Sequence, residues 1–293
     1  MLDACKRPQR NLKRHVRFGL QAMSHRPRKR FSQNFLIDET IIGAIVDSVS
    51  PRPQDRMVEI GPGLAAITRP LAHIVRPLHV VEIDRDIVER LRRDFSVEQV
   101  VVHQGDALEF DFAALGPELR VVGNLPYHIS TPILFHLAES AYALRDIHAM
   151  LQAEVVERMI APPGSSDYGR LSVMLQYRFE MEKVLDVPAA AFRPEPKVES
   201  ALIRIVPRRD AWHPAKDERM LSDTVALAFS QRRKTLRNTL GRVLGAADFE
   251  MLKIDPQARA QTLSVTEFVA IADYRTPQSH GDAVVDREPK EER

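Results

Sequence analysis

Short runs rich in β-branched residues alternate with helix-like stretches between residues 54 and 206, and this alternation strongly constrains the fold. The candidate strands are residues 56–60, 78–83, 100–103, 120–122 and 147–151. Strands separated by helical segments are typical of a parallel sheet with helices on both faces. The sequence therefore predicts an α/β fold with a binding crevice beyond the carboxyl ends of its strands.

A different pattern follows a Pro-rich stretch at 194–196 and a last predicted strand at 201–206. Apolar residues then recur at helical spacing over 221–244, interrupted by basic residues. We predict a basic N-terminal extension over 1–27, an α/β domain over 28–206, a smaller all-helical C-terminal domain over 207–275 and a disordered tail over 276–293. The residues before Met23 are expected to be an extension, or sequence upstream of the true start, without a catalytic role.

Composition narrows the class of protein. No apolar run approaches the roughly 18 residues that a membrane span needs, so we expect a soluble protein without membrane contact. The single cysteine, Cys5, excludes an internal disulfide and favours a reducing compartment. The ten histidines show no His-Glu-x-x-His spacing, so no metal site is predicted.

A glycine turn follows the first predicted strand. Gly61 and Gly63 precede a predicted helix whose first turn holds Ala65 and Ala66. Glycine permits close backbone approach, and a helix N-terminus favours anionic groups. The third glycine of a dinucleotide fingerprint would fall near Thr68 and is absent, which disfavours a nicotinamide cofactor. A purely structural turn is the alternative.

Two acids at the next strand ends indicate a nucleoside-containing cofactor. Glu82 ends the second strand about twenty residues after the glycines, where an acid can accept both ribose hydroxyls of an adenosine. Asp106 follows the third strand, where its carboxylate can accept a hydrogen bond from an adenine amine. An exposed strand-end carboxylate and a structural Gly-Asp turn are the alternatives.

The most specific motif is Gly-Asn-Leu-Pro-Tyr over residues 123–127, at the end of the fourth strand. An adenine amine is a poor nucleophile because its lone pair is delocalised into the ring. The Asn124 side-chain oxygen and the Leu125 backbone carbonyl can each accept one amine hydrogen and direct the lone pair at a sulfonium methyl. Pro126 stiffens the turn, and Tyr127 offers a ring for base stacking. A structural Asn-x-Pro turn is the alternative.

With these motifs, the chain resembles the ribosomal RNA adenine dimethyltransferase family, specifically its small-subunit, kasugamycin-resistance branch. The resemblance covers nearly all of residues 28–274. It is carried by residues 28–36, 61–64, 81–84, 124–127, 168–173, 192–200 and 231–238. It implies a Rossmann-like class I S-adenosylmethionine-dependent methyltransferase fold with a smaller helical domain.

The resemblance also implies roles for individual residues. Asn34 and Leu36 would close over S-adenosylmethionine, while Gly61, Glu82 and Asp106 would hold its methionine, ribose and adenine portions.

On the base side, the resemblance places Asn124 beside the methyl group. Phe192 would pack against the target adenine opposite Tyr127, a sandwich that suits a base taken out of its stack. Core packing is the alternative for Phe192.

A cluster of basic residues on the predicted helical domain suits RNA phosphates, with a solvated helix face as the alternative. We favour RNA contact because few acids balance these residues and because the family acts on ribosomal RNA. The cluster comprises Arg232, Arg233, Lys234 and Arg237.

The implied reaction is dimethylation of the N6 amines of two adjacent adenosines near the 3′ end of small-subunit (16S-type) ribosomal RNA. The expected partners are that RNA and the assembling small ribosomal subunit, and the expected enzyme is a cytoplasmic monomer.

Three alternatives stay open. A macrolide-resistance relative would act on large-subunit RNA, but residues 168–173 and the helical domain fit the small-subunit branch better. An assembly checkpoint or a transcription factor, like some mitochondrial relatives, would bind without methylating, and the intact motif at 124–127 argues against it. A nicotinamide dehydrogenase rests only on a shared fold.

Overall fold

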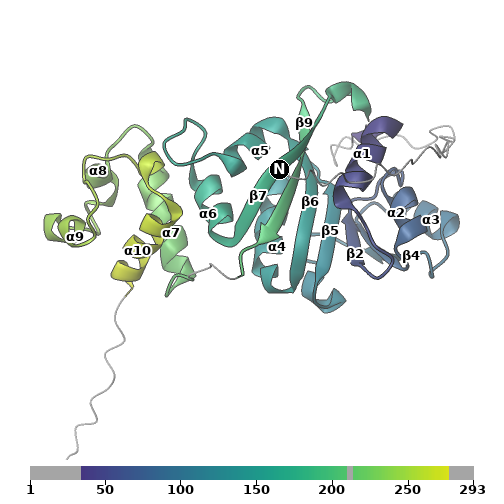
Figure 1. Cartoon of the computed structure of the whole chain (residues 1–293), viewed down its shortest axis with the longest axis horizontal. Coiled ribbons are helices and arrows are strands. Elements are labelled where there is room, and N and C mark those ends of the chain that lie inside the picture. Colours follow the sequence, from purple (N-terminus) through teal and green to yellow (C-terminus); the bar gives the residue numbers. More distant parts are fainter. Residues whose placement is uncertain (1–33, 210–213, 277–293) are drawn as a thin grey trace, which may run out of the picture.

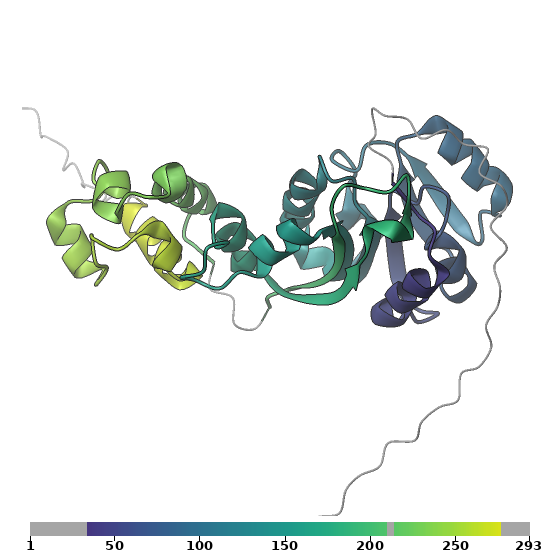
Figure 2. The same cartoon turned by 90° about the horizontal axis from the view of Figure 1, so that it is seen from above.

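The computed structural model describes residues 34–209 and 214–276. A twisted sheet covered by helices forms the larger part of an elongated molecule, and a group of C-terminal helices forms the other end (Figure 1; Figure 2). The extension predicted over 1–27 lies outside the described residues, as does all but the first residue of the tail predicted over 276–293.

Seven strands form the main sheet. They are β2 (Arg56–Ile60), β3 (Leu78–Glu82), β4 (Val100–Gln104), β5 (Leu119–Asn124), β6 (Leu144–Gln152), β7 (Phe179–Val187) and β9 (Ser200–Pro207). Their order is β4-β3-β2-β5-β6-β9-β7. The strands from β2 to β6 are parallel, whereas β9 is antiparallel to both of its neighbours. All six predicted strands are confirmed, although β4, β5, β6 and β9 extend beyond their predicted bounds and β3 ends one residue earlier.

The strand β7 was not predicted from the sequence. Charged residues such as Lys183 and Asp186 interrupt its apolar pattern. They are tolerated because β7 is the last strand of the sheet and much of its surface faces solvent. A second, two-stranded sheet pairs β1 (Phe35–Leu36) with β8 (Phe192–Arg193) in antiparallel register.

Helices cover both faces of the main sheet, as predicted. One apolar core lies between the sheet and α1 (Glu39–Val49), α2 (Thr68–Ile74) and α3 (Arg85–Asp94). The opposite core lies against α4 (Ser130–Glu139), α5 (Ala153–Ile160) and α6 (Arg170–Arg178). Short 3₁₀ helices η2 (Phe112–Leu115), η3 (Ala141–Ala143) and η4 (Ala189–Ala191) lie in the connections.

The start of α2 differs from the prediction. Ala65 and Ala66 lie in a turn before the helix, which begins only at Thr68. Ala65 adopts a φ of +66°, a left-handed conformation that a right-handed helix cannot include. The prediction that these alanines form the first helical turn is therefore wrong.

The C-terminal end contains α7 (Glu218–Ala228), α8 (Leu236–Leu240), α9 (Ala246–Met251) and α10 (Val265–Arg275), with η5 (Phe229–Gln231) and η6 (Ala260–Thr262) between them. The apolar residues at helical spacing over 221–244 do not form a single helix, because η5 and a turn separate α7 from α8. Arg232, Arg233 and Lys234 lie in that turn, and only Arg237 of the basic cluster is on a helix.

A third apolar core joins the C-terminal helices to residues that precede the predicted boundary at 207. Tyr168, Val173 and Tyr177 belong to this core, whereas Leu175 belongs to a core of the sheet. The helix α6 therefore presents side chains to both parts of the molecule.

Among the helices of residues 34–209 and 214–276, none combines the length and apolar character required to span a membrane.

Candidate active site

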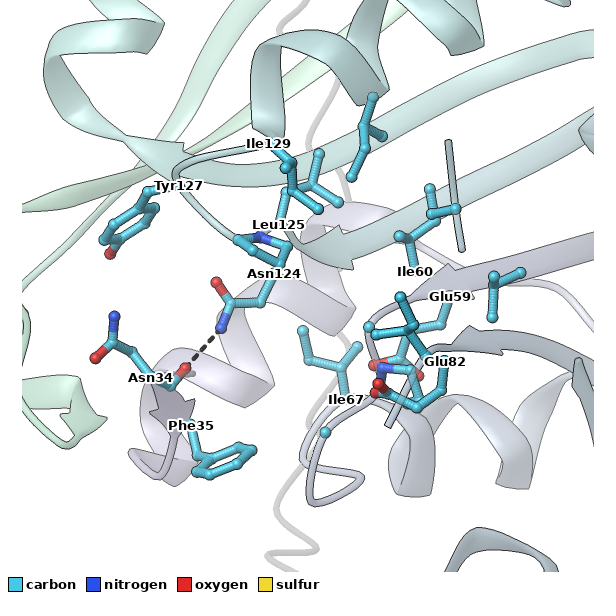
Figure 3. Close-up of a pocket in the computed structure, with 18 of the residues that line it drawn as sticks. Asn34, Phe35, Glu59, Ile60, Ile67, Glu82, Asn124, Leu125, Tyr127 and Ile129 are labelled. Atoms are coloured by element: carbon cyan, nitrogen blue, oxygen red, sulfur yellow. Dashed lines mark hydrogen bonds between the residues drawn. The ribbon is translucent and has the colours of Figure 1, made fainter. Parts of the chain in front are cut away.

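The sheet has a topological switch point between β2 and β5. From this pair the strand order runs outward in opposite directions, and open α/β sheets bind ligands at such a point. A cavity of about 310 Å³ lies there, at the carboxyl ends of the strands. Its wall includes nine of the predicted site residues: Asn34, Leu36, Gly61, Glu82, Asp106, Asn124, Leu125, Pro126 and Tyr127 (Figure 3).

Close backbone packing explains the glycines beside the cavity. Gly61 and Gly63 have φ values of +68° and +54°, which favour glycine. A Cβ on Gly63 would lie 3.1 Å from the Cδ1 atom of Phe35. A Cβ on Gly123 would lie only 2.6 Å from the backbone oxygen of Ile60, so β2 and β5 approach closely only because this residue has no side chain.

The acids at the strand ends are held by the backbone. Glu82 is 6% exposed, and its Oε1 accepts a hydrogen bond from the Asp84 N–H at 2.9 Å. Burial raises the pKa of this carboxyl. Asp106 Oδ1 accepts a hydrogen bond from the Leu108 N–H at 2.9 Å, which orients the carboxylate at the cavity wall.

The structure adds Glu59 to these acids. This side chain at the end of β2 also lines the cavity and is 2% exposed. Burial raises the pKa of Glu59 to about 8. Thr68 has a smaller effect that lowers this pKa, and the charge of Glu82 raises it further. The Oε2 atom of Glu59 has no hydrogen-bond partner within the described part of the chain. The sequence signal for Glu59 is a charged residue between apolar residues of a strand.

Asn124 has a defined amide orientation. Its Nδ2 donates a hydrogen bond to the Asn34 backbone carbonyl at 3.0 Å. A carbonyl can only accept, so the amide nitrogen must face it. The Oδ1 atom is therefore directed away from Asn34, on the side where the ring of Tyr127 lies (Figure 3). A hydrogen-bond acceptor, Asn124 Oδ1, and the aromatic ring of Tyr127 therefore lie on the same side of the cavity, at the end of β5.

The rest of the motif is also held in place. The Leu125 N–H donates to the Met150 carbonyl at 3.2 Å, and the Pro126 carbonyl accepts from the Ile129 N–H at 3.1 Å, which closes a turn. The Tyr127 hydroxyl shares a 2.7 Å hydrogen bond with the Ser200 hydroxyl of β9. Burial raises the pKa of Tyr127, so its ring carries no charge at neutral pH.

Phe192 is not brought to the surface of this cavity. It lies in β8, is 1% exposed and belongs to the core beneath α1. Its register partner is Leu36 of β1, which does line the cavity. Core packing therefore describes this structure, and stacking of Phe192 on a base would require the β1–β8 pair to move.

The basic cluster lies elsewhere, in the turn between η5 and α8 and at Arg237 on α8. Its four residues are exposed, and none forms an ion pair with any residue in the described part of the chain: Arg232, Arg233, Lys234 and Arg237. Residues 34–209 and 214–276 also contain no group of His, Cys, Asp or Glu placed to hold a metal ion.

A mixed sheet with one reversed strand and a cavity at its switch point, bordered by a glycine turn and acidic strand ends, defines a Rossmann-like class I S-adenosylmethionine-dependent methyltransferase. The chain belongs to the ribosomal RNA adenine dimethylase family, whose sequence profile matches residues 24–276.

Two relatives match most of the length of this chain. The chain is 57% identical to ribosomal RNA small subunit methyltransferase A of Thiobacillus denitrificans, over 85% of this chain and 98% of the relative. It is 58% identical to the protein of the same name from Aromatoleum aromaticum, over 87% and 96% of the two chains.

Solved structures share the fold. The 23S rRNA methyltransferase ErmE is 27% identical, with a TM-score of 0.63 over 83% of this chain and 99% of its own. A dimethyladenosine transferase from Plasmodium falciparum is 23% identical, with a TM-score of 0.67 over 80% and 94% of the two chains.

Proposed function

We propose that this protein transfers methyl groups from S-adenosylmethionine to the N6 amines of two adjacent adenosines near the 3′ end of small-subunit ribosomal RNA. Each adenosine receives two methyl groups. The observation that carries this proposal is the fixed amide of Asn124, whose acceptor oxygen is directed to the side of the cavity where the Tyr127 ring lies (Figure 3).

The chemistry of the cavity fits the cofactor. The glycine turn over 61–63 leaves room for close approach by a methionine chain, and the buried carboxylate of Glu82 suits a ribose diol. Asp106 suits the adenine amine, while Asn34 and Leu36 complete the wall from β1 and the residue before it. When bound, S-adenosylmethionine supplies an electrophilic methyl group.

The residues at the end of β5 orient the target amine. Asn124 Oδ1 and the Leu125 carbonyl accept its two hydrogens and favour the pyramidal nitrogen of the transition state. Because the Asn34 carbonyl holds the other side of the amide, Oδ1 does not have to be reoriented when the base arrives. Tyr127 stacks on the base, with its ring anchored through Ser200.

Phe192 would form the second face of the base sandwich only after the β1–β8 pair opens. Its burial supports a site that is completed by substrate binding rather than one that is open beforehand.

The relatives favour small-subunit RNA over large-subunit RNA as the substrate. Identity is 57–58% to proteins named for the small subunit, compared with 27% to a 23S rRNA methyltransferase. The basic cluster, which forms no ion pair within the described part of the chain, would bind phosphates of that RNA within the assembling small subunit. The protein would act in the cytoplasm as a monomer.

Incubation with labelled S-adenosylmethionine and small subunits that lack the modification, followed by mass spectrometry of nucleosides, tests the proposal. Dimethyladenosine is the expected product. Asn124→Ala should bind the cofactor but form product at least about 10²-fold more slowly, as expected when a fixed hydrogen-bonding group is lost at a transition state. Asn124→Asp should also fail, because it places a carboxylate oxygen against the Asn34 carbonyl.

Gln99→Ala is the matched control. It removes an amide from the turn before β4, the strand at one edge of the sheet, and should leave the product unchanged. If the wild type bound the cofactor and the subunits but formed no dimethyladenosine, the proposed activity would be wrong and a role in assembly alone would be favoured.

A further inference from the structure

The connection between β4 and β5 forms one wall of the methyl-transfer cavity. Its first part, residues 105–108, lines the cavity and includes Asp106, whereas residues 109–112 do not line it. We call residues 105–112 the adenine loop, after the cofactor group that Asp106 suits. Residues 105–111 contain neither helix nor strand. The position of the adenine loop therefore depends on contacts with neighbouring elements.

Two histidines support the adenine loop from the neighbouring strands. The ring of His103, near the end of β4, packs against the ring of Phe110, with 5.1 Å between the ring centroids. The Nδ1 atom of His79 on β3 lies 2.9 Å from His103 Nε2, and the two ring planes differ by only 17°. One ring therefore donates an N–H to the other. This bond fixes the orientation of the His103 ring against Phe110.

The bond between the two rings requires a neutral acceptor, because two protonated rings would place two donors against each other. Both rings are half-buried. Burial lowers the pKa of His103, and burial together with the charges of His103 and Arg56 lowers the pKa of His79. At neutral pH the pair therefore keeps the acceptor nitrogen that the bond needs.

A third histidine holds the adenine loop from the helix α4. His136 Nε2 lies 2.8 Å from the backbone oxygen of Phe110. Because a carbonyl can only accept, Nε2 carries the hydrogen in this contact. The ring of Phe112, which is fully buried, lies 5.7 Å from the His136 ring and 5.1 Å from the Phe110 ring, between their centroids. Phe110 is therefore held through its ring by His103 and through its carbonyl by His136.

A short turn connects Phe110 to Asp106. The backbone oxygen of Asp106 accepts a hydrogen bond from the Glu109 N–H at 3.1 Å, and its Oδ1 accepts one from the Leu108 N–H at 2.9 Å. Phe110 directly follows this turn. Because the two bonds restrict the backbone between Asp106 and Glu109, a displacement of Phe110 would also displace the Asp106 carboxylate.

We propose that His79, His103 and His136 are positioning residues for the methyl donor. They hold the adenine loop so that the Asp106 carboxylate faces the adenine amine of S-adenosylmethionine. None of the three histidines lines the cavity, so they act through Phe110 and not by contact with the cofactor. This proposal rests on the proposed function, which assigns Asp106 to that amine. A carboxylate that is oriented beforehand loses less freedom on binding, so the histidines raise cofactor affinity.

Titration calorimetry with S-adenosylmethionine tests the contact from α4. His136→Phe keeps a ring beside Phe112 but lacks the N–H, so we expect about tenfold weaker binding, the effect of one lost hydrogen bond. The KM for the cofactor should rise by the same factor, while kcat at saturating cofactor stays unchanged. His136→Gln offers an amide N–H in place of the ring N–H and should restore much of the affinity.

Glu139→Gln is the matched control for this contact. Glu139 lies 3.4 Å from the other ring nitrogen of His136, and its side chain is largely exposed. The substitution leaves the Nε2–H on Phe110, so cofactor binding should equal that of the wild type.

The strand histidines are tested in the same titration. His79→Phe removes the bond to His103 but leaves the His103 ring against Phe110. His103→Ala removes both contacts and should therefore weaken cofactor binding more than His79→Phe does. Thermal unfolding checks that each variant is folded, and His79→Phe tests the same bond if His103→Ala does not fold.

A cofactor analogue with hydrogen in place of the adenine amine separates positioning of Asp106 from a general loss of packing. This analogue offers no hydrogen to Asp106, so the wild type and His136→Phe should bind it equally well. Equal losses of affinity for the analogue and for S-adenosylmethionine would overturn the positioning role. An unchanged affinity of His136→Phe for S-adenosylmethionine would overturn it as well.

These titrations do not depend on methyl transfer, so their result is distinct from that of the product assay. A wild type that binds S-adenosylmethionine but forms no dimethyladenosine would overturn the proposed function and leave the role of the histidines intact. Loss of the positioning role would leave the proposed function intact if the wild type still formed that product.

Discussion

Glu59 places a titratable carboxyl in the buried wall of the cavity. Its carboxyl is buried, and one of its oxygens has no hydrogen-bond partner in the described part of the chain. Ionising such a group is unfavourable, so the pKa is raised to about 8. The cavity therefore contains a carboxyl that is mostly protonated at neutral pH before any cation binds.

This burial predicts how stability depends on pH. Between about pH 4.5 and 8 the carboxyl is protonated in the folded protein and ionised in the unfolded chain, so unfolding releases a proton. The contribution of Glu59 to the free energy of unfolding is fully present below pH 4.5 and is lost as pH rises to about 8, by an amount on the order of 4 kcal/mol. Glu59→Gln cannot ionise and should lose less stability over this range.

Urea unfolding of the cofactor-free protein at pH 5 and pH 8 measures the effect. The difference between the two pH values should be smaller in Glu59→Gln than in the wild type. Equal differences in the two proteins would show that Glu59 ionises normally in the folded state.

At the scale of elements, the contact between β2 and β5 positions the site. Gly61 follows one strand, Asn124 ends the other, and the missing Cβ of Gly123 lets the strands approach. Part of the cofactor side and part of the base side of the cavity therefore depend on the same strand pair. A change that separates these strands should affect both sides.

Gly123→Ala tests this packing. Its Cβ would meet backbone of Ile60 at 2.6 Å, so a strand must shift, and we expect a loss of about 1–3 kcal/mol in unfolding free energy together with weaker cofactor binding. Gly105→Ala is the matched control, because a Cβ there has no neighbour within 4 Å. Calorimetry that found Gly123→Ala as stable as Gly105→Ala would contradict the expected clash.

At the scale of the whole molecule, α6 joins the two ends. Leu175 packs with the sheet, while Val173 and Tyr177 pack with the C-terminal helices. The Gly164 N–H also donates to the Gln261 carbonyl at 2.7 Å, which links the loop after α5 to η6. Through these contacts the C-terminal helices are coupled to the catalytic part, so the two should unfold together.

Phe268→Leu should reveal this coupling. Phe268 is buried in the core of the C-terminal helices, and the smaller side chain should lower stability by about 1–2 kcal/mol. Native-state hydrogen exchange should then show an equal loss of protection in α10 and in β6. A loss confined to α10 would mean that the C-terminal helices open independently.

The sequence by itself determined the strand positions, the glycine turn, the acidic strand ends and the motif at 124–127. These features are local, because hydrophobic periodicity and residue chemistry can be read within a few positions of the chain. The parallel order of the strands then brings their carboxyl ends to one edge of the sheet. Most of the candidate site was therefore predictable.

Only the tertiary structure decided how the site is held together. The partner of the Asn124 amide is the Asn34 carbonyl, 90 residues away, and the partner of Tyr127 is Ser200 of β9. The burial of Phe192 depends on the pairing of β8 with β1, which no local pattern encodes. A second cavity likewise combines the start of α6 with the turn after η5, because contacts between distant segments arise only when the chain packs.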